Sequence, residues 1–136
     1  MASWDTLVGY VRNNYKIANE FRDDTGHVNG LQMLFDVGDL RSQLIYLWEH
    51  NLNGGTEPWF TIASPFARAS NVDVVGVLES VGANVCGGVA KVGDLLVLKH
   101  AVPLATLDIL EFERPLMLVV HTADALEEKF AGGDSF

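Results

Sequence analysis

The chain has 136 residues, of which 49% are hydrophobic and 10% aromatic, and this composition predicts one folded domain over residues 1–136. Eighteen acidic residues against nine Lys and Arg give a formal net charge of −9, so we expect no nucleic-acid partner. No apolar run approaches the ~18 residues of a membrane-spanning helix, and the first residues lack the pattern of a signal peptide. We therefore expect a cytoplasmic protein with no membrane partner.

The first predicted element is a short helix that begins after Ser3, a residue type that caps helix N-termini. Its apolar stripe consists of Trp4, Leu7, Val8 and Val11. The stripe fades at Asn13 and Asn14. From residue 15 to 21 the pattern fits either a strand or a longer helix, and residues 23–30 are typical of a turn-rich loop. The structure of residues 15–30 therefore stays open.

Three antiparallel strands are predicted next. Residues 31–37 alternate between the two faces of a strand, Gly38 and Asp39 form a tight connection, and residues 40–51 return as a second strand. After a loop rich in Asn and Gly, residues 59–64 have strong strand preference, and we expect Pro65 to end that strand.

A second helix and a second hairpin follow. We expect Ser70 or Asn71 to cap the helix and Gly82 to end it. The predicted stripe of this helix is Val74, Val75, Leu78 and Val81. Two glycines then open a strand over residues 87–92, a turn follows, and residues 95–102 return.

The longest helical pattern runs from Pro115 to Phe130, with Pro115 in the first turn and Gly132 and Gly133 closing the helix. Its predicted stripe is Leu116, Val119, Val120, Ala123, Leu126 and Phe130. Its predicted exposed side carries Asp124, Glu127, Glu128 and Lys129. A separate short helical turn is expected at residues 106–112.

This order of elements predicts an α+β fold in which three helices pack against an antiparallel five-stranded sheet. Three short motifs accompany it: RSQ at residues 41–43, Ser64–Pro65 at the end of the third strand, and AD-A-LE-x-x-x-x-GGD-x-F at residues 123–136. With this order, the chain resembles the YbjN-type and actinobacterial relatives of the class I type III secretion chaperones over nearly its whole length. The resemblance implies a curved sheet, a homodimer and a non-enzymatic role, in some members that of holding an extended client segment.

The apolar pattern of the second strand also points to a partner. Leu44, Tyr46 and Trp48 lie on one face of it, and Ile45 and Leu47 lie on the other. Apolar residues on both faces need cover on both, and contiguous apolar surface is unusual on monomers. We expect a homodimer, unless the three helices and the long loops cover both faces.

Residue types that could act in catalysis or bind a metal are scattered along the chain. Cys86 has no second thiol, and Asp23 and Asp24 lie in a predicted turn without a neighbouring His. The histidines have no metal-ligand spacing; they are His27, His50, His100 and His121. Neither a phosphate-binding loop nor a nucleophile elbow is present. We therefore expect no catalytic, cofactor-binding or metal-binding residues, and no enzyme.

The candidate partner-binding residues lie on the second and third strands. They are Arg41, Gln43, Ile45, Leu47, Trp48, Trp59 and Phe60. Arg41 and Gln43 share a strand face and could orient the backbone or a carboxylate of a client; Arg41 could equally pair with Asp36 or Asp39. Trp48, Trp59 and Phe60 could anchor an interface or pack in the core.

The function that the sequence favours is chaperone-like: a homodimer that holds an extended peptide segment of a client protein, without a cofactor. Two alternatives stay open. The chain could be a regulatory protein that binds a folded partner, or a dimeric domain with no client site.

Overall fold

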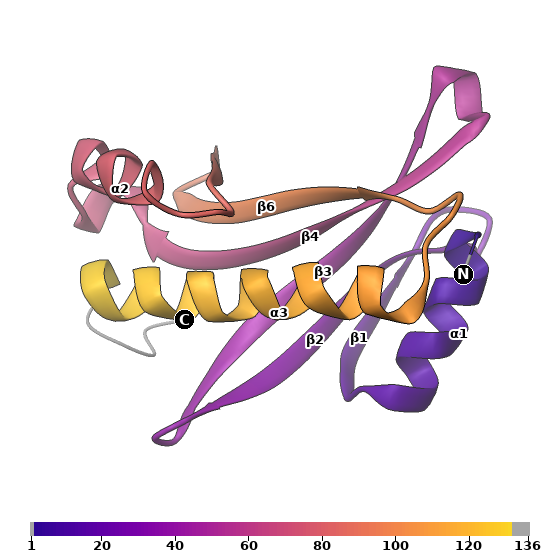
Figure 1. The fold of residues 1–136 in the computed structure, drawn as a ribbon, viewed down its shortest axis with the longest axis horizontal. Coiled ribbons are helices and arrows are strands. Elements are labelled where there is room, and N and C mark those ends of the chain that lie inside the picture. Colours follow the sequence, from indigo (N-terminus) through magenta and orange to yellow (C-terminus); the bar gives the residue numbers. More distant parts are fainter. Residues whose placement is uncertain (1, 132–136) are drawn as a thin grey trace.

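The computed structural model describes residues 2–131, which form three α-helices and one antiparallel sheet of six strands (Figure 1). The elements in chain order are α1 (Trp4–Asn14), β1 (Ile17–Arg22), β2 (Val28–Gly38), β3 (Arg41–Leu52), β4 (Glu57–Arg68), α2 (Val74–Val81), β5 (Gly88–Val92), β6 (Leu95–Pro103) and α3 (Ile109–Leu126). Single 3-10 turns occur at Asn53–Gly55 and Ala69–Asn71, and a π-helical turn at Glu127–Ala131 continues α3. The fold class is therefore α+β, as the sequence predicts.

The sheet has the order β1-β2-β3-β4-β6-β5, and every neighbouring pair is antiparallel. The prediction of five strands is wrong, because the undecided segment forms β1 and the start of β2. Ile17 pairs with Met33 and Phe21 with Gly30, with a register shift after each of these β1 residues. Such shifts break the period-2 alternation that reveals a strand in a sequence.

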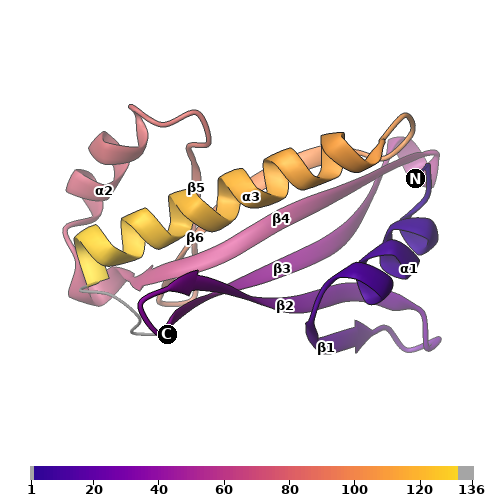
Figure 2. The same cartoon turned by 60° about the horizontal axis from the view of Figure 1, so that its bottom comes forward.

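The three helices share one face of the sheet, and α3 crosses it from end to end (Figures 1 and 2). The side chains that α3 buries there are Phe112, Leu116, Val119, Val120, Ala123 and Leu126. They meet inward-facing residues of the sheet, among them Ile45 and Leu47 of β3 and Phe60 and Ile62 of β4, all fully buried. A large part of the hydrophobic core therefore lies between α3 and the sheet.

Helix α3 begins six residues before Pro115, so the predicted N-terminus is wrong. Asp108 caps it: the Asp108 side chain accepts a hydrogen bond from the Glu111 backbone at 2.8 Å, and the Glu111 carboxylate accepts one from the Asp108 backbone at 3.2 Å. This capping box satisfies two otherwise unpaired donors and places Pro115 inside the helix. The predicted stripe is confirmed, with Phe130 half-buried, but Glu127 is buried rather than exposed.

The predicted closing glycines, Gly132 and Gly133, lie outside the described residues. None of the helices within residues 2–131 is both long and apolar enough to cross a membrane.

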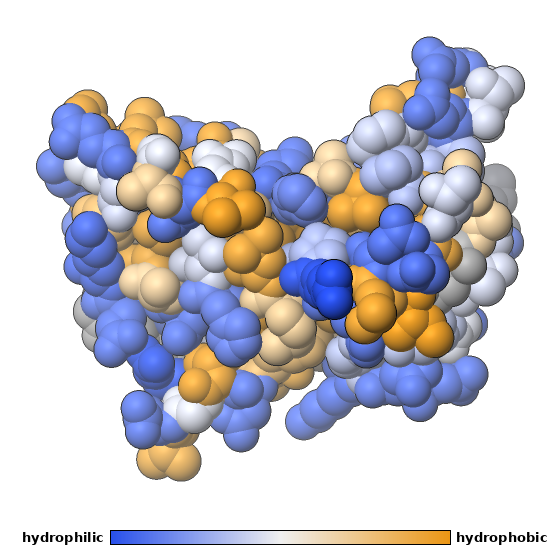
Figure 3. Space-filling view, viewed as in Figure 1, coloured by the Kyte–Doolittle hydropathy of each residue, from blue (hydrophilic) through white to orange (hydrophobic). Residues whose placement is uncertain are grey.

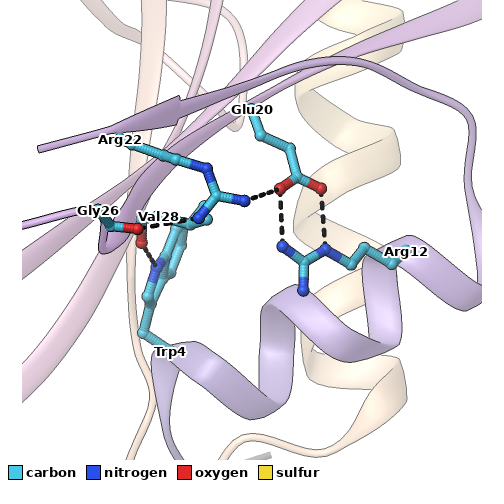
Figure 4. A network of polar contacts seen from close by, with 6 residues as sticks. All are labelled: Trp4, Arg12, Glu20, Arg22, Gly26 and Val28. Carbon is cyan, nitrogen blue, oxygen red and sulfur yellow. Dashed lines mark hydrogen bonds and ion pairs between the residues drawn. The ribbon is translucent and has the colours of Figure 1, made fainter.

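Helix α1 is fastened to β1 and β2 by polar contacts, and its predicted cap and stripe are confirmed. The Arg12 guanidinium donates two hydrogen bonds to the Glu20 carboxylate, at 2.8 and 2.7 Å, and Trp4 Nε1 donates to the Val28 carbonyl at 2.7 Å (Figure 4). Arg22 joins the same network through Glu20 and the Gly26 carbonyl. The network fixes the edge strand β1, which the sequence pattern leaves undefined.

The other end of α1 reaches α3. Tyr10 and Tyr15 both donate hydrogen bonds to Oε2 of Glu113, at 3.1 and 2.7 Å. Burial, followed by these hydrogen bonds to a carboxylate, raises the pKa of both phenols above the ordinary value, so both stay protonated donors. Both rings meet Phe112 edge to face.

Strand β4 and helix α2 differ from prediction in two ways. Pro65 does not end β4. Its carbonyl faces β3, whose ladder with β4 stops at Ala63, so the missing N–H costs no ladder bond and the strand continues beside β6 to Arg68. Helix α2 begins after Asp73, not after Ser70 or Asn71. Its inward residues are Val77 and Val81, whereas Val75 and Leu78 of the predicted stripe are 64% and 51% exposed.

We predict that Asp108→Ala lowers the free energy of unfolding by about 0.5–2 kcal/mol, the usual loss for an N-cap that makes its hydrogen bond. Urea denaturation measures it. Asp73→Ala is the matched control, because Asp73 occupies the N-cap position of α2 but its side chain makes no capping hydrogen bond. Equal losses in the two variants would contradict the assigned role of the capping box.

Candidate functional site

The face of the sheet turned away from the helices is the candidate site, and we call it the open face. No helix within residues 2–131 lies on it (Figures 1 and 2). Its side chains alternate along each strand with those that α3 covers. The larger apolar members are Phe21, Leu34, Leu44, Tyr46, Trp48, Ala63, Pro65, Leu95 and Val97.

An aromatic cluster occupies the β1–β3 side of the open face. The ring centroids of Tyr46 and Trp48 are 5.9 Å apart with nearly parallel planes, and Phe21 lies 5.1 Å from Trp48. The Trp48 indole lies flat over Gly30 of β2, where an added Cβ would fall 2.1 Å from Cζ3. The missing side chain at Gly30 is therefore what lets the indole rest on the backbone.

Two hollows lie beside this cluster. The first, which we call the Tyr46 hollow, has a volume of about 230 Å³ and is lined by Tyr46, Trp48, Ala63, Pro65, Val92, Leu95, Val97 and Lys99. The second, the Trp59 hollow, has a volume of about 140 Å³ and is lined by His50, Leu52, Trp59, Phe60, Thr61, Lys99 and Ala101. Lys99 lines both, so the two hollows adjoin at this side chain along β4 and β6, and we call the pair the depression.

The helix side of the molecule offers a more broken apolar surface. Figure 3 shows apolar side chains over the helices, interrupted by hydrophilic ones. Ile109, Leu110 and Met117 of α3 are 48%, 56% and 36% exposed. Isolated apolar side chains of this kind are normal on protein surfaces.

Both edges of the sheet are poor templates for an added strand. At one edge, β1 has register shifts and carries the charged Glu20 and Arg22. At the other, β5 has five residues and includes Lys91. Bulges, short strands and charges are the features by which edge strands avoid pairing with other chains. The open face is therefore the better candidate for contact with a partner.

Four of the seven predicted partner-binding residues lie inside the protein. Ile45, Leu47 and Phe60 are fully buried on the helix side of the sheet, and Gln43 is 1% exposed. Their side chains are not accessible in the folded chain, although Phe60 lies at the floor of the Trp59 hollow, so the sequence pattern assigns them to the wrong surface. The correction is one of strand face: the partly exposed side of β3 is that of Leu44, Tyr46 and Trp48.

Trp48 and Trp59 do lie on the open face, and each lines one hollow. Sequence reasoning did not assign Pro65, Leu95, Val97 or Lys99 to the site. The sequence of residues 95–102 predicts a strand with apolar side chains on both faces. It does not indicate which of the two faces the helices cover.

Gln43 has a structural role. Its Nε2 donates to Ser64 Oγ at 2.9 Å and to the Pro65 carbonyl at 3.2 Å, and Ser64 Oγ donates to the Leu44 carbonyl at 2.7 Å. These buried bonds connect β3 and β4. Since a slip of one residue would break them, they help to fix the register of the two strands.

Arg41 faces the C-terminal end of α3. Its guanidinium lies 3.3 Å from Asp124 and 3.1 Å from Glu128, not against Asp36 or Asp39. The hydrogen bond to Glu128 is the main cause that raises the pKa of Arg41. Arg41 thus joins the β2–β3 hairpin to the C-terminal part of the long helix.

The remaining chemical groups are accounted for locally. Asp23 accepts hydrogen bonds within its own turn, foremost from the Thr25 side chain, and these lower its pKa. His27 Nε2 lies 2.6 Å from Glu49, which raises the pKa of His27, and burial raises that of the Cys86 thiol. Within residues 2–131, no three His, Cys, Asp or Glu side chains gather as a metal-ligand set.

Comparison with known proteins returns no match to this chain among family models, curated proteins or solved structures.

We predict that Gly30→Ala displaces the Trp48 indole and lowers the free energy of unfolding by about 1–3 kcal/mol, as overpacking does. Near-ultraviolet circular dichroism reports the tryptophan environment, and urea denaturation reports stability. Gly9→Ala in α1 is the control, because nothing lies within 4 Å of its added Cβ, and it should raise stability by up to about 1 kcal/mol. A Gly30→Ala protein with an unchanged tryptophan spectrum would contradict the packing.

We predict that Arg41→Gln accelerates hydrogen exchange of the amides at residues 124–131, because it removes both ion pairs that hold this segment. High salt should reduce the difference between variant and parent. Arg114→Gln on α3 is the control, since Arg114 forms no ion pair within residues 2–131. Unchanged exchange in Arg41→Gln would return Arg41 to a role in client recognition.

Proposed function

We propose that this chain is a chaperone-like, non-enzymatic binding protein that holds an extended segment of a client protein on its open face. It acts as a homodimer and needs no cofactor. The proposal extends the resemblance to YbjN-type relatives of the type III secretion chaperones, with one strand more than that resemblance implies.

The observation that carries the proposal is the apolar, hollowed open face. A sheet with one face in water normally alternates apolar and polar side chains, so polar residues would be expected where Tyr46, Trp48 and Val97 stand. The three side chains of the aromatic cluster, Phe21, Tyr46 and Trp48, provide a large apolar contact area and lose little conformational entropy when they bind. A concave apolar surface of this kind suits a segment that brings its own apolar side chains.

The proposed dimer uses a different surface, the outer side of α2. Val75 and Leu78 are 64% and 51% exposed there, and Val85 after the helix is 92% exposed. Val75 and Leu78 are one helical turn apart and form an outward apolar stripe on α2, beside the exposed Glu79. A second copy packed against α2 would cover these residues and leave both open faces free for clients.

A binding assay tests the client site. The probe is a fluorescently labelled protein that is kept unfolded by reduction and carboxymethylation of its cysteines, compared with the same protein in its native state. We expect the unfolded form to bind and the native form not to bind. Leu95→Gln, in the Tyr46 hollow, should weaken binding about five- to tenfold through lost apolar contact.

Met117→Gln is the matched control, because it makes the same kind of change on the outer side of α3 and should leave the affinity unchanged. Binding of the native form as well as the unfolded one would favour a regulator of folded partners. If neither form binds, and Leu95→Gln converts a dimer to a monomer in sedimentation, the open face is the dimer interface and the client site does not exist.

A further inference from the structure

The depression on the open face differs in charge from the rest of the protein. The chain carries 18 acidic residues and a net charge of −9, yet Lys99 is the one Lys, Arg, Asp or Glu residue that lines either hollow. Lys99 is exposed, stands where the two hollows meet, and forms no ion pair within residues 2–131. A ligand with a carboxylate would therefore find a free cation at the middle of the depression. The acid next to its walls, Glu57, accepts hydrogen bonds from Trp59 Nε1, at 2.8 Å, and from Asn53.

The backbone of a ligand meets a different constraint. The backbone N–H and C=O groups of β3, β4 and β6 lie in the plane of the sheet and point toward neighbouring strands, not toward the open face. The ladders leave β3 without a β2 partner beyond Trp48 and β6 without a β5 partner beyond Lys99, but those groups also point along the sheet. A segment that lies across this face cannot extend the ladder. Its C=O groups must stay solvated, and its N–H groups must stay solvated or be absent.

Polyproline II is the extended conformation that satisfies this requirement. It has no internal hydrogen bonds, its backbone is solvated, and each proline removes one N–H donor. Grooves lined by aromatic side chains are the usual receptors for such segments. Here the aromatic rings are Tyr46 and Trp48 in one hollow and Trp59 in the other.

The dimensions also fit. From Leu95 to Ala101 of β6, which line opposite ends of the depression, the strand rises about 20 Å. At about 3.1 Å per residue, a polyproline II segment of six or seven residues covers that length. One carboxylate near the centre of such a segment would lie beside Lys99.

Two other ligand classes fit less well. Single-stranded nucleic acid also stacks on aromatic rings, but it needs a basic groove, and one lysine on a chain of net charge −9 does not provide it. A glycan needs hydroxyl partners. The Tyr46 hydroxyl accepts from Gln32 at 2.9 Å and keeps a single donor, and the other walls of that hollow are apolar except for Lys99. In the Trp59 hollow, His50 and Thr61 bond to each other at 3.2 Å.

We propose that the two hollows on the open face hold a proline-rich client segment in the polyproline II conformation, with a carboxylate of that segment beside Lys99. The inference rests on the proposed function and specifies which extended segments the site selects. It places recognition on the face of the sheet rather than at its edges.

The test uses two acetylated and amidated peptides of about seven residues, the length that the depression accommodates. One contains prolines with a leucine and a central glutamate, and in the other the prolines are replaced by alternating valine and threonine. Affinities come from the protein's tryptophan fluorescence, and amide chemical shifts map the contact. We expect the proline peptide to bind at least about tenfold more tightly, with shifts on β3, β4 and β6.

Lys99→Gln should weaken binding of the proline peptide about two- to fivefold, and a glutamine in place of its glutamate should have the same effect. Lys16→Gln removes the same charge at the α1–β1 connection and should change nothing. Circular dichroism confirms that each variant is folded.

Equal affinity for the two peptides, or tighter binding of the valine–threonine peptide, overturns the inference and leaves the client function standing. The same holds if neither peptide binds but the carboxymethylated unfolded protein does. If none of the three binds, the proposed function fails too. Shifts confined to α2 or α3 would also overturn the assignment of the site.

Discussion

The packing of α3 across one face of the sheet is the interaction on which the rest of the structure depends. Leu116, Val119 and Ala123 are fully buried against the sheet, while α1 is tied to α3 through Glu113 and α2 through a hydrogen bond between Lys129 and Ser80. All three helices are therefore engaged on the same side. The opposite face keeps apolar residues that no described helix covers, and the hollows, the aromatic cluster and both proposals follow from this one-sided arrangement.

Much of the fold could be predicted because local chemistry and tertiary structure agree. The alternation of β3, the glycines before β5 and the stripe of α3 each indicate the observed element. The errors come from interactions between distant residues. The strand β1 owes its place to pairing with β2 and to the ion pair between Arg12 and Glu20, neither of which a local pattern reveals. The start of α3 was readable, since Asp108 and Glu111 have capping-box spacing, but the helix-starting preference of Pro115 suggested a later boundary.

The site was harder to predict than the fold. The pattern of β3 identifies two apolar faces, and only the position of α3 decides which one is the core. Gln43, Ile45, Leu47 and Phe60 were assigned to a partner and belong to the interior, while Trp48 and Trp59 lie on the exposed side. The depression combines side chains from four strands that are distant in sequence. Lys99, the basic residue at its centre, belongs to no sequence motif that would indicate a binding site.

The position of the long helix in the chain has a consequence for biosynthesis. Helix α3 follows all six strands in sequence, and β6, the strand that joins β5 to β4, directly precedes it. While a ribosome is still producing residues 95–131, the strands already synthesised expose apolar side chains on both of their faces to water. Such a nascent sheet cannot close its interior and is prone to aggregate. The hydrophobic core can therefore close only after the last turns of α3 have left the ribosomal tunnel.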